Sequence, residues 1–196
     1  MGVALGKGKK MSGLKSVCVY CGSSNRVDPK YLTLGENMGR AIARRGVRLV
    51  YGGGDVGLMG ASSRTALAEG GKVLGVMPKF LTTIEKPNPA IETRLVDTMH
   101  ERKWMLFDEA DAFIVLPGGI GTLEEIVETL SWYRLSLHRK PSVFVDTAFW
   151  APFFKLIDQT VDVGFTPTDF RNAYMAVDTP EEALDALEAA LARAAA

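Results

Sequence analysis

Short apolar runs rich in Val alternate along the chain with stretches of helical periodicity. The apolar runs lie at residues 16–20, 47–51, 72–77, 112–116 and 141–145. Strands that alternate with helical patterns of roughly 10–15 residues are typical of a parallel sheet built from β–α–β units. The pattern therefore predicts an α/β fold of the Rossmann-like class, a doubly wound parallel sheet with helices on both faces.

Capping residues and glycines mark the boundaries of the predicted helices. These helices cover residues 29–45, 58–69, 99–110, 122–137, 149–158 and 180–193. Asp28, Thr98 and Thr179 precede three of them and carry the side-chain oxygens that cap helix N-termini. Residues 78–95 contain three Pro and show no clear period, so we expect a long loop of functional importance there. Residues 175–177 are expected to form an edge strand.

Composition and charge narrow the class of protein. The chain has 196 residues, with 23 Lys and Arg against 23 Asp and Glu, so its formal net charge is zero. Binding to nucleic acids depends on a basic surface that attracts the phosphate backbone, and a chain with no net charge gives no sign of one. No nucleic-acid partner is therefore predicted. No apolar run is long enough to predict a membrane span. Two Cys cannot build a disulfide scaffold, which favours a reducing, cytoplasmic setting.

The length suits one domain, which we expect to cover residues 15–196. Residues 1–14 are rich in Gly and Lys and lack periodicity, so they are expected to form a flexible tail. This stretch also lacks the apolar core of a signal peptide.

Cys18 and Cys21 have the spacing of a redox or metal-binding pair, but they lie at the end of a predicted strand. Reactive pairs usually lie at a helix N-terminus, which stabilises the thiolate. Strand positions three apart point to opposite faces of a sheet. A zinc site would need further ligands, and the chain offers only His100 and His138. Both cysteines are therefore interpreted as structural, and no metal is predicted.

The first glycine-rich turn, residues 52–57 (GGGDVG), matches the G-x-G-x-x-G spacing of dinucleotide-binding turns. However, it follows the second predicted strand, and no acidic residue ends the following strand at Met77 to hold a ribose hydroxyl. A tight turn with close helix–sheet packing would also explain the glycines. We favour a turn that lines a nucleotide site over an NAD-linked oxidoreductase, and no cofactor is predicted.

The second glycine-rich turn, residues 117–125 (PGGIGTLEE), follows a buried strand and opens a helix. Backbone N–H groups and the helix dipole make such a terminus an anion site. Gly118, Gly119 and Gly121 would let a phosphate approach the backbone, and the Thr122 hydroxyl would add a donor. The segment lacks the GK[ST] of a P-loop, so a monophosphate is a better match than a triphosphate.

Two interpretations of Glu125 remain open. Thr122 and Glu125 have the spacing of a capping box, which would make Glu125 structural. Alternatively, Glu125 is a carboxylate that stabilises a cation or orients a water molecule. In both cases we expect the helix dipole to keep Glu125 ionised, which makes it a poor general acid.

Arg102 and Lys103 are adjacent cations in the predicted first turn of the helix that follows Thr98. Cations there oppose the helix dipole, at about 0.3–1 kcal/mol per charge. Either an anionic ligand compensates for this cost, or the two side chains face solvent with Glu101 as a local partner.

Residues 51–60 (YGGGDVGLMG), 99–103 (MHERK) and 117–125 are more specific in combination than any one is alone. Together they resemble the Lonely Guy family, the cytokinin riboside 5′-monophosphate phosphoribohydrolases, over about residues 15–190. Members of this family have often been labelled lysine decarboxylases. The residues argue against that label, because no Lys lies in a recognisable pyridoxal-phosphate setting with an acidic partner.

The resemblance implies a role for each matching residue. Arg102 and Glu125 match the family's catalytic pair, and Lys103 matches the Lys beside that Arg. The positions that match substrate-binding residues are Lys103, Gly118, Gly119, Ile120, Gly121, Thr122, Glu124, Ser131 and Glu85. The implied reaction is hydrolysis of the N-glycosidic bond of an adenosine 5′-monophosphate, N6-modified or not, to free base and ribose 5-phosphate. It requires no metal or other cofactor.

A non-catalytic alternative is a Rossmann-like carrier of a nucleotide or of the molybdenum cofactor. Such a carrier would use the same phosphate-binding turn but would not need Arg102 and Glu125 together. The helix at residues 122–137 also carries more apolar surface than one core face needs, because Trp132, Leu135 and Leu137 extend beyond its core-facing stripe. We therefore expect a homodimer packed through this helix, as the resemblance also implies, with the active site close to the interface.

Overall fold

A computed structural model describes residues 13–195 of the chain. The predicted flexible tail therefore lies outside the described residues, except for its last two positions. Of these, Leu14 is partly buried against the core, so the folded part begins slightly earlier than the predicted boundary.

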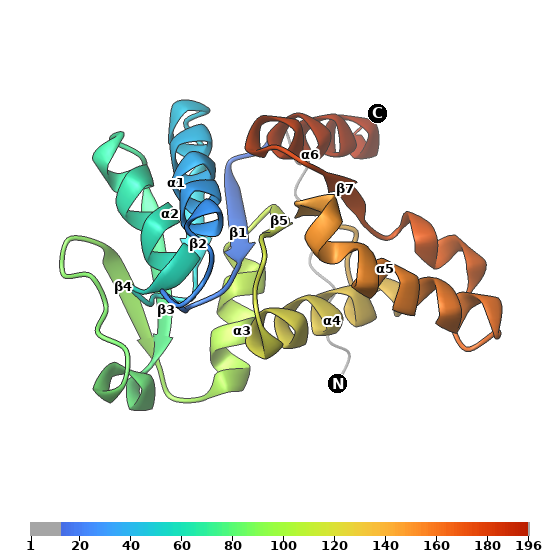
Figure 1. Cartoon of the computed structure of the whole chain (residues 1–196), viewed down its shortest axis with the longest axis horizontal. Coiled ribbons are helices and arrows are strands. Elements are labelled where there is room, and N and C mark those ends of the chain that lie inside the picture. The colour runs from blue at the N-terminus through green and yellow to red at the C-terminus, as the bar shows by residue number, and fades with distance from the viewer. Residues whose placement is uncertain (1–12, 196) are drawn as a thin grey trace, which may run out of the picture.

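A seven-stranded parallel sheet forms the centre of the structure (Figure 1). Its strand order is β4-β3-β2-β1-β5-β6-β7, and all adjacent strands are parallel. The strands are β1 (Ser16–Tyr20), β2 (Arg48–Tyr51), β3 (Val73–Pro78), β4 (Glu92–Val96), β5 (Ala112–Val115), β6 (Ser142–Val145) and β7 (Met175–Val177). The α/β, Rossmann-like prediction is confirmed.

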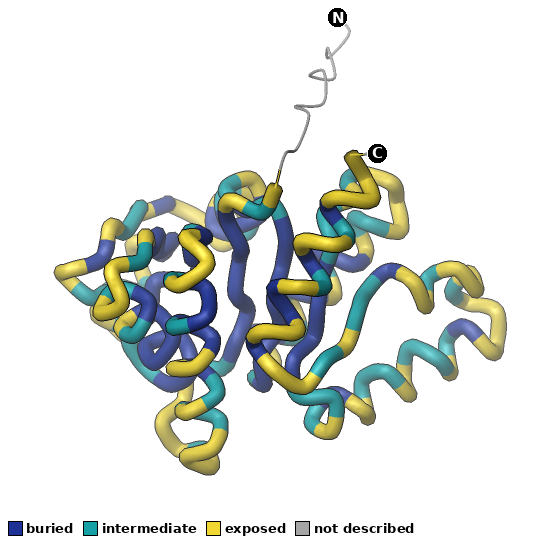
Figure 2. Tube along the Cα trace, turned by 90° about the horizontal axis from the view of Figure 1, so that it is seen from above, coloured by how far each residue is buried: buried dark blue, intermediate teal, exposed yellow. Residues whose placement is uncertain are grey.

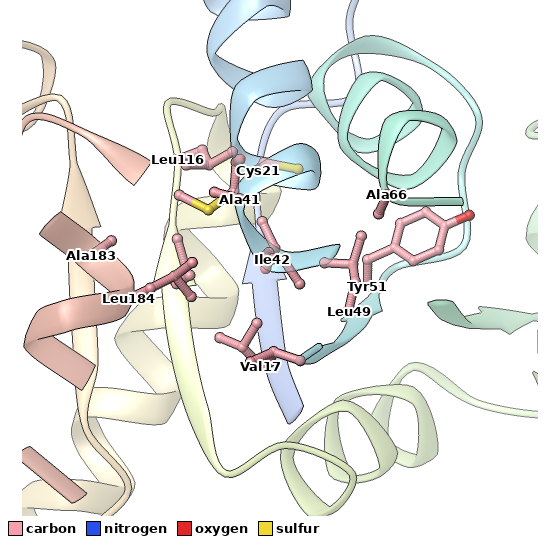
Figure 3. Close-up of a cluster of buried hydrophobic side chains, with 14 of the residues drawn as sticks. Val17, Cys21, Ala41, Ile42, Leu49, Tyr51, Ala66, Leu116, Ala183 and Leu184 are labelled. Carbon is pink, nitrogen blue, oxygen red and sulfur yellow. The ribbon is translucent and has the colours of Figure 1, made fainter. Parts of the chain in front are cut away.

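Helices cover both faces of this sheet. They are α1 (Pro29–Arg44), α2 (Gly57–Ala68), α3 (Met99–Asp108), α4 (Ile120–Arg134), α5 (Thr147–Asp162) and α6 (Pro180–Ala195), with short 3₁₀ turns η1 (Lys79–Thr83) and η2 (Thr168–Asn172). One core cluster joins α1, α2 and α6 to the sheet, and Figure 3 shows part of it. A second cluster joins α3, α4 and α5 to the opposite face. The sheet is therefore doubly wound.

Alternation along β1 supplies side chains to both clusters. Val17 and Val19 belong to the first cluster, Cys18 belongs to the second, and Cys21, just after the strand, belongs to the first again. Central strands are dark blue in Figure 2 because both of their faces are covered. The two cysteines are free and lie on opposite faces, as predicted for a structural pair, and burial raises the pKa of each thiol.

Side-chain caps fix three helix starts as predicted. The Asp28 carboxylate accepts from the Lys30 backbone N–H at 3.0 Å. Thr98 and Glu101 form a reciprocal capping box at the start of α3. The Thr179 hydroxyl accepts from the backbone N–H of Glu182 at 3.3 Å, and the Glu182 carboxylate accepts in return from that of Thr179.

Three predictions about elements were wrong. The helix predicted at residues 149–158 is longer and covers Thr147–Asp162. Residues 78–95 are not a structureless loop, because they contain η1 and the edge strand β4. β4 pairs with β3 alone and is only partly buried, so its sequence lacks the apolar run that marks the inner strands. The helix predicted at residues 122–137 begins at Ile120 and ends at Arg134. None of the helices within residues 13–195 is both long and apolar enough to cross a bilayer.

Candidate active site

A cavity of about 530 Å³ opens at the carboxyl edge of the sheet, beside β1 and β5. From β1 the chain builds the sheet outwards to β4, and from β5 it builds the sheet in the opposite direction to β7. The loops after the adjacent strands β1 and β5 therefore run in opposite directions and leave a crevice between them. Open α/β sheets bind ligands at this position. A hydrogen bond from the Gly22 N–H to the Pro117 carbonyl, at 3.0 Å, ties the two loops together below the cavity mouth.

The second glycine-rich turn forms one side of the cavity. Gly118, Gly119, Ile120, Gly121 and Thr122 all line it. α4 begins at Ile120, and its N-cap Gly119 contributes no side-chain cap, so the N–H groups of the first turn are available to an anion. The expected phosphate site is therefore brought to the cavity.

Glu125 does not form the proposed capping box. It is the sixth residue of α4, and Thr122 is the third, so neither occupies the position that a box requires. Both side chains instead face the cavity. The capping-only interpretation of Glu125 is wrong because the helix starts two residues earlier than the sequence pattern indicated.

Arg102 and Glu125 form a nearly buried ion pair inside the cavity. Arg102 Nη1 lies 3.4 Å from Glu125 Oε1, and their side chains are only 11% and 12% exposed. The guanidinium also donates to the backbone carbonyls of Val76 and Gly52, each at 3.3 Å. Arg102 is thus held from three directions, and it does not lie on a solvated helix face as one interpretation proposed.

The first glycine-rich turn binds this arginine. A Cβ at Gly52 would collide with Arg102 Nη2. Gly52 is therefore required because the guanidinium passes directly over its backbone. None of residues 52–57 is among the described residues that line the cavity, so the prediction that this turn lines the site is wrong. The turn supports the site through its contact with Arg102, which an NAD site would not need. Arg102 is also the fourth residue of α3, beyond the positions where the helix dipole acts most strongly.

Burial raises the pKa of Glu125 to about 7, even though Arg102 opposes the shift. The helix dipole therefore does not keep the pKa of Glu125 low, contrary to expectation. The dipole falls off beyond the first turn of a helix, so at the sixth position desolvation outweighs it. A carboxyl with this pKa can gain or lose a proton near neutral pH.

Three of the predicted site residues lie elsewhere. Lys103 Nζ is 2.6 Å from Glu124 Oε1 and 3.0 Å from Glu128 Oε1, so it joins α3 to α4. Lys103, Glu124 and Ser131 are not among the described residues that line the cavity. Substrate contacts by these three remain predictions, since nothing in the geometry of a single chain brings them to the site.

Glu85 does line the cavity, from the segment between β3 and β4. Its carboxylate lies so close to Gly54 that a Cβ there would be only 2.5 Å from Glu85 Oε2. A β-bridge between Gly54 and Pro87 holds this segment against the first glycine-rich turn. The predicted counterpart of the family's nucleotide-contacting Glu is therefore at the site.

The sequence interpretation missed several lining residues. They are Cys21, Gly22, Ser23, Ser24, Val27, Tyr31, Leu58, Met59, Leu81, Pro117 and Phe149. Ser23 and Ser24 could have been found, because they belong to the loop that follows the carboxyl end of β1. Tyr31 and Phe149 carry no such signal, since only the folded arrangement of α1 and α5 brings them together.

We predict that Gly118→Ala lowers activity by displacing the Thr122 side chain, which a Cβ at that position would meet. Thr122→Ala should mainly weaken nucleotide binding, because it removes the hydroxyl and leaves the start of α4 intact. Glu128→Gln serves as the control, since Glu128 is on the same helix and is not among the described residues that line the cavity. Release of ribose 5-phosphate measures the activity of each variant, calorimetry measures its affinity for AMP, and the melting temperature shows whether the fold is intact. Equal melting and equal affinity in Gly118→Ala and the parent would contradict the proposed contact.

Comparisons with known proteins agree with this geometry. A family model described as "Possible lysine decarboxylase" matches residues 59–187. The chain is 40% identical over 183 residues to the cytokinin riboside 5′-monophosphate phosphoribohydrolase LOG of Oryza sativa subsp. japonica, covering 92% of this chain and 76% of the relative. It is 42% identical over 176 residues to the cytokinin riboside 5′-monophosphate phosphoribohydrolase of Rhodococcoides fascians, covering 88% and 89%. The chain belongs to the cytokinin riboside 5′-monophosphate phosphoribohydrolase family.

This phosphoribohydrolase family member also shares its fold with a more distant protein. The molybdenum cofactor carrier protein of Chlamydomonas reinhardtii matches with a TM-score of 0.69 and 19% identity, over 91% of this chain and 98% of that one. The likeness concerns the fold alone. The decarboxylase description does not suit the site either, because no lysine is among the described lining residues, and pyridoxal phosphate would need one for its Schiff base.

Proposed function

We propose that this chain hydrolyses the N-glycosidic bond of adenosine 5′-monophosphates, including N6-modified ones, and releases the free base and ribose 5-phosphate. The observation that carries the proposal is the buried Arg102–Glu125 pair beside the glycine-rich turn that opens α4. The relatives named as phosphoribohydrolases support the substrate class. A carrier protein would need the turn but not the pair.

Each part of the cavity has a role in this reaction. The 5′-phosphate binds the N–H groups at the start of α4 and the Thr122 hydroxyl, which orients the ribose. Cleavage of a glycosidic bond develops positive charge on the sugar. The Glu125 carboxylate stabilises that charge or directs the attacking water, whose oxygen bonds to the ribose carbon as the bond to the base breaks. One water proton stays on the new ribose hydroxyl, and the second is released as the base takes up a proton, so that the products are the neutral base and ribose 5-phosphate.

Arg102 acts as a fixed cation. A guanidinium keeps its proton in proteins, so Arg102 does not serve as the acid. It positions the Glu125 carboxylate and assists the departing base, and the Val76 and Gly52 carbonyls hold it in place. Glu85 contacts the nucleotide from the other side of the cavity. These roles require no metal or redox cofactor.

The test is release of ribose 5-phosphate from AMP and from an N6-prenylated AMP by the purified protein. Turnover of either nucleotide is the expected result, and their ratio identifies the preferred base. Binding of both nucleotides with no release of base would contradict hydrolysis and favour a carrier.

We predict that kcat for AMP rises with pH through about 7 and levels off above it. The pKa of Glu125 is raised to about 7, and the mechanism uses the carboxylate, whose fraction grows as pH rises through that value. Measuring kcat at saturating AMP between pH 5.5 and 9 checks this, because saturation limits the effect of the substrate's own phosphate. A rate that falls through pH 7 would instead identify protonated Glu125 as the active form.

The proposal includes a homodimer packed through α4. Trp132 was expected to extend the apolar surface of this helix, but it packs against the second core cluster instead. Ile120, Val127, Ser131 and Leu135 follow one another at spacings of seven and four, which places them on one face of the helix. Ile120 is 83% exposed, Val127 49% and Leu135 58%, so this face is largely apolar and uncovered in the single chain. A second copy would cover it, and Ser131 would then face the partner rather than the cavity of its own chain.

Ile120 both lies on this face and lines the cavity, so the active site would adjoin the interface. Light scattering at micromolar concentration is expected to give a mass near 43 kDa, twice the 21.3 kDa of one chain. A mass of one chain would contradict the dimer, whereas a hexamer would indicate a second interface.

We also infer a cytoplasmic setting. Both cysteines are buried free thiols on opposite faces of the sheet, so they cannot pair with each other within the fold. A chain whose thiols are used only for packing suits a reducing compartment.

A further inference from the structure

Two of the residues that line the cavity form an aromatic pair. Tyr31 is on α1 and Phe149 is on α5, and their rings meet edge to face with centroids 5.8 Å apart. Tyr31 packs against the core cluster of one face of the sheet and Phe149 against that of the other. The two side chains therefore reach past the carboxyl edge of the sheet to meet, and both line the cavity.

Strand order places this pair over the phosphate turn. Tyr31 follows β1 and Phe149 follows β6, and β5 lies between these two strands in the sheet. A contact between residues after β1 and β6 must therefore pass across the turn that follows β5. That turn carries Gly118 to Thr122, to which we assign the 5′-phosphate.

The described lining of the cavity offers no free cation to a second phosphate group. Val27, Ile120, Tyr31 and Phe149 are apolar or aromatic lining residues. Within the described lining, Arg102 is the one Lys or Arg, and its guanidinium is already engaged by Glu125 and two carbonyls. A second phosphate would lose water against aromatic carbon without meeting a free cation, which is costly for a charged group.

We propose that the Tyr31–Phe149 pair is the specificity element that limits the substrate to nucleoside 5′-monophosphates and excludes diphosphates and triphosphates. The inference rests on the proposed hydrolysis, since it assigns the phosphate to the start of α4. It goes beyond that proposal because it names the side chains that limit how many phosphate groups the site accepts. Lys30 Nζ lies 4.8 Å from the centroid of the Tyr31 ring, so loss of the ring would also leave a cation close to a longer phosphate chain.

The experiment compares release of adenine from AMP and ADP by the parent, by the double variant Tyr31→Ala/Phe149→Ala, and by Tyr31→Phe. Both side chains are only partly buried, so the double variant is expected to fold, which circular dichroism checks. The ratio of kcat/KM for ADP to that for AMP should rise at least about 10-fold in the double variant. Tyr31→Phe keeps the ring and should keep the parent's ratio.

Calorimetry provides a second measurement if turnover by the double variant is too slow. The ratio of the dissociation constants of ADP and AMP should then fall by a similar factor relative to the parent. An unchanged ratio in the double variant, or a parent that accepts ADP as readily as AMP, would overturn the inference. Absence of base release from both AMP and an N6-prenylated AMP by the parent would instead contradict the proposed function, and the calorimetric ratio would still test the aromatic pair.

Discussion

Glu125→Gln is expected to lower kcat for AMP at least about 100-fold while leaving the protein folded. Gln has nearly the same shape as Glu but carries no negative charge, so it cannot stabilise the developing positive charge on the ribose. Steady-state release of ribose 5-phosphate measures the loss. Glu128→Gln is the matched control, because it removes a carboxylate from the same helix outside the cavity, and it should change kcat little.

The same substitution should raise stability at alkaline pH. The pKa of Glu125 is about 7 in the folded protein, against 4.5 for an unperturbed Glu, so between these values the folded state binds more protons than the unfolded state. The free energy of unfolding of the parent therefore falls as pH rises through this window, by on the order of 3 kcal/mol. Gln does not titrate, so Glu125→Gln should melt above the parent at pH 8. Near-normal turnover with earlier melting would show that Glu125 has a structural role only.

Arg102→Ala is expected to lower kcat/KM by about 100-fold or more, because it removes the cation that positions Glu125 and assists the leaving base. Arg102 opposes the effect of burial on Glu125, so its loss should raise the pKa of Glu125 further. The pH at which the remaining activity reaches half its maximum should then move above that of the parent. The pH dependence of kcat separates this effect from a general loss of structure.

Arg102→Lys is the control for charge alone. Lys keeps the positive charge, but its ammonium group lacks the planar fork with which Arg102 reaches the Val76 and Gly52 carbonyls and Glu125 together. We therefore expect Lys to restore little of the activity. If Arg102→Ala retained the parent's kcat/KM at every pH, the pair could not be part of the reaction.

Much of the scaffold could be predicted from the sequence because its signals are local. The inner strands are apolar runs that must be buried on both faces, and Asp28, Thr98 and Thr179 mark helix starts through hydrogen bonds to the next residues along the chain. The phosphate-binding turn could also be predicted locally, because a buried strand, a run of glycines and a helix follow one another directly along the chain. β4 escaped prediction because an edge strand is only partly buried and needs no apolar run.

The resemblance to a family identified Arg102 and Glu125, but their state depends on the tertiary structure. Their pairing joins α3 to α4, and the carbonyls that hold Arg102 belong to the turn after β2, at Gly52, and to β3, at Val76. The pKa of Glu125 depends on how completely the fold removes it from water, which no local pattern encodes. Tyr31 and Phe149 approach only because strand order brings the starts of α1 and α5 to either side of one turn.

The sequence by itself determined which segments become strands, helices and an anion-binding turn, since these depend on neighbours along the chain. Only the tertiary structure decided the protonation of the carboxyl and the extent of the cavity, because burial and long-range contacts arise when distant segments pack.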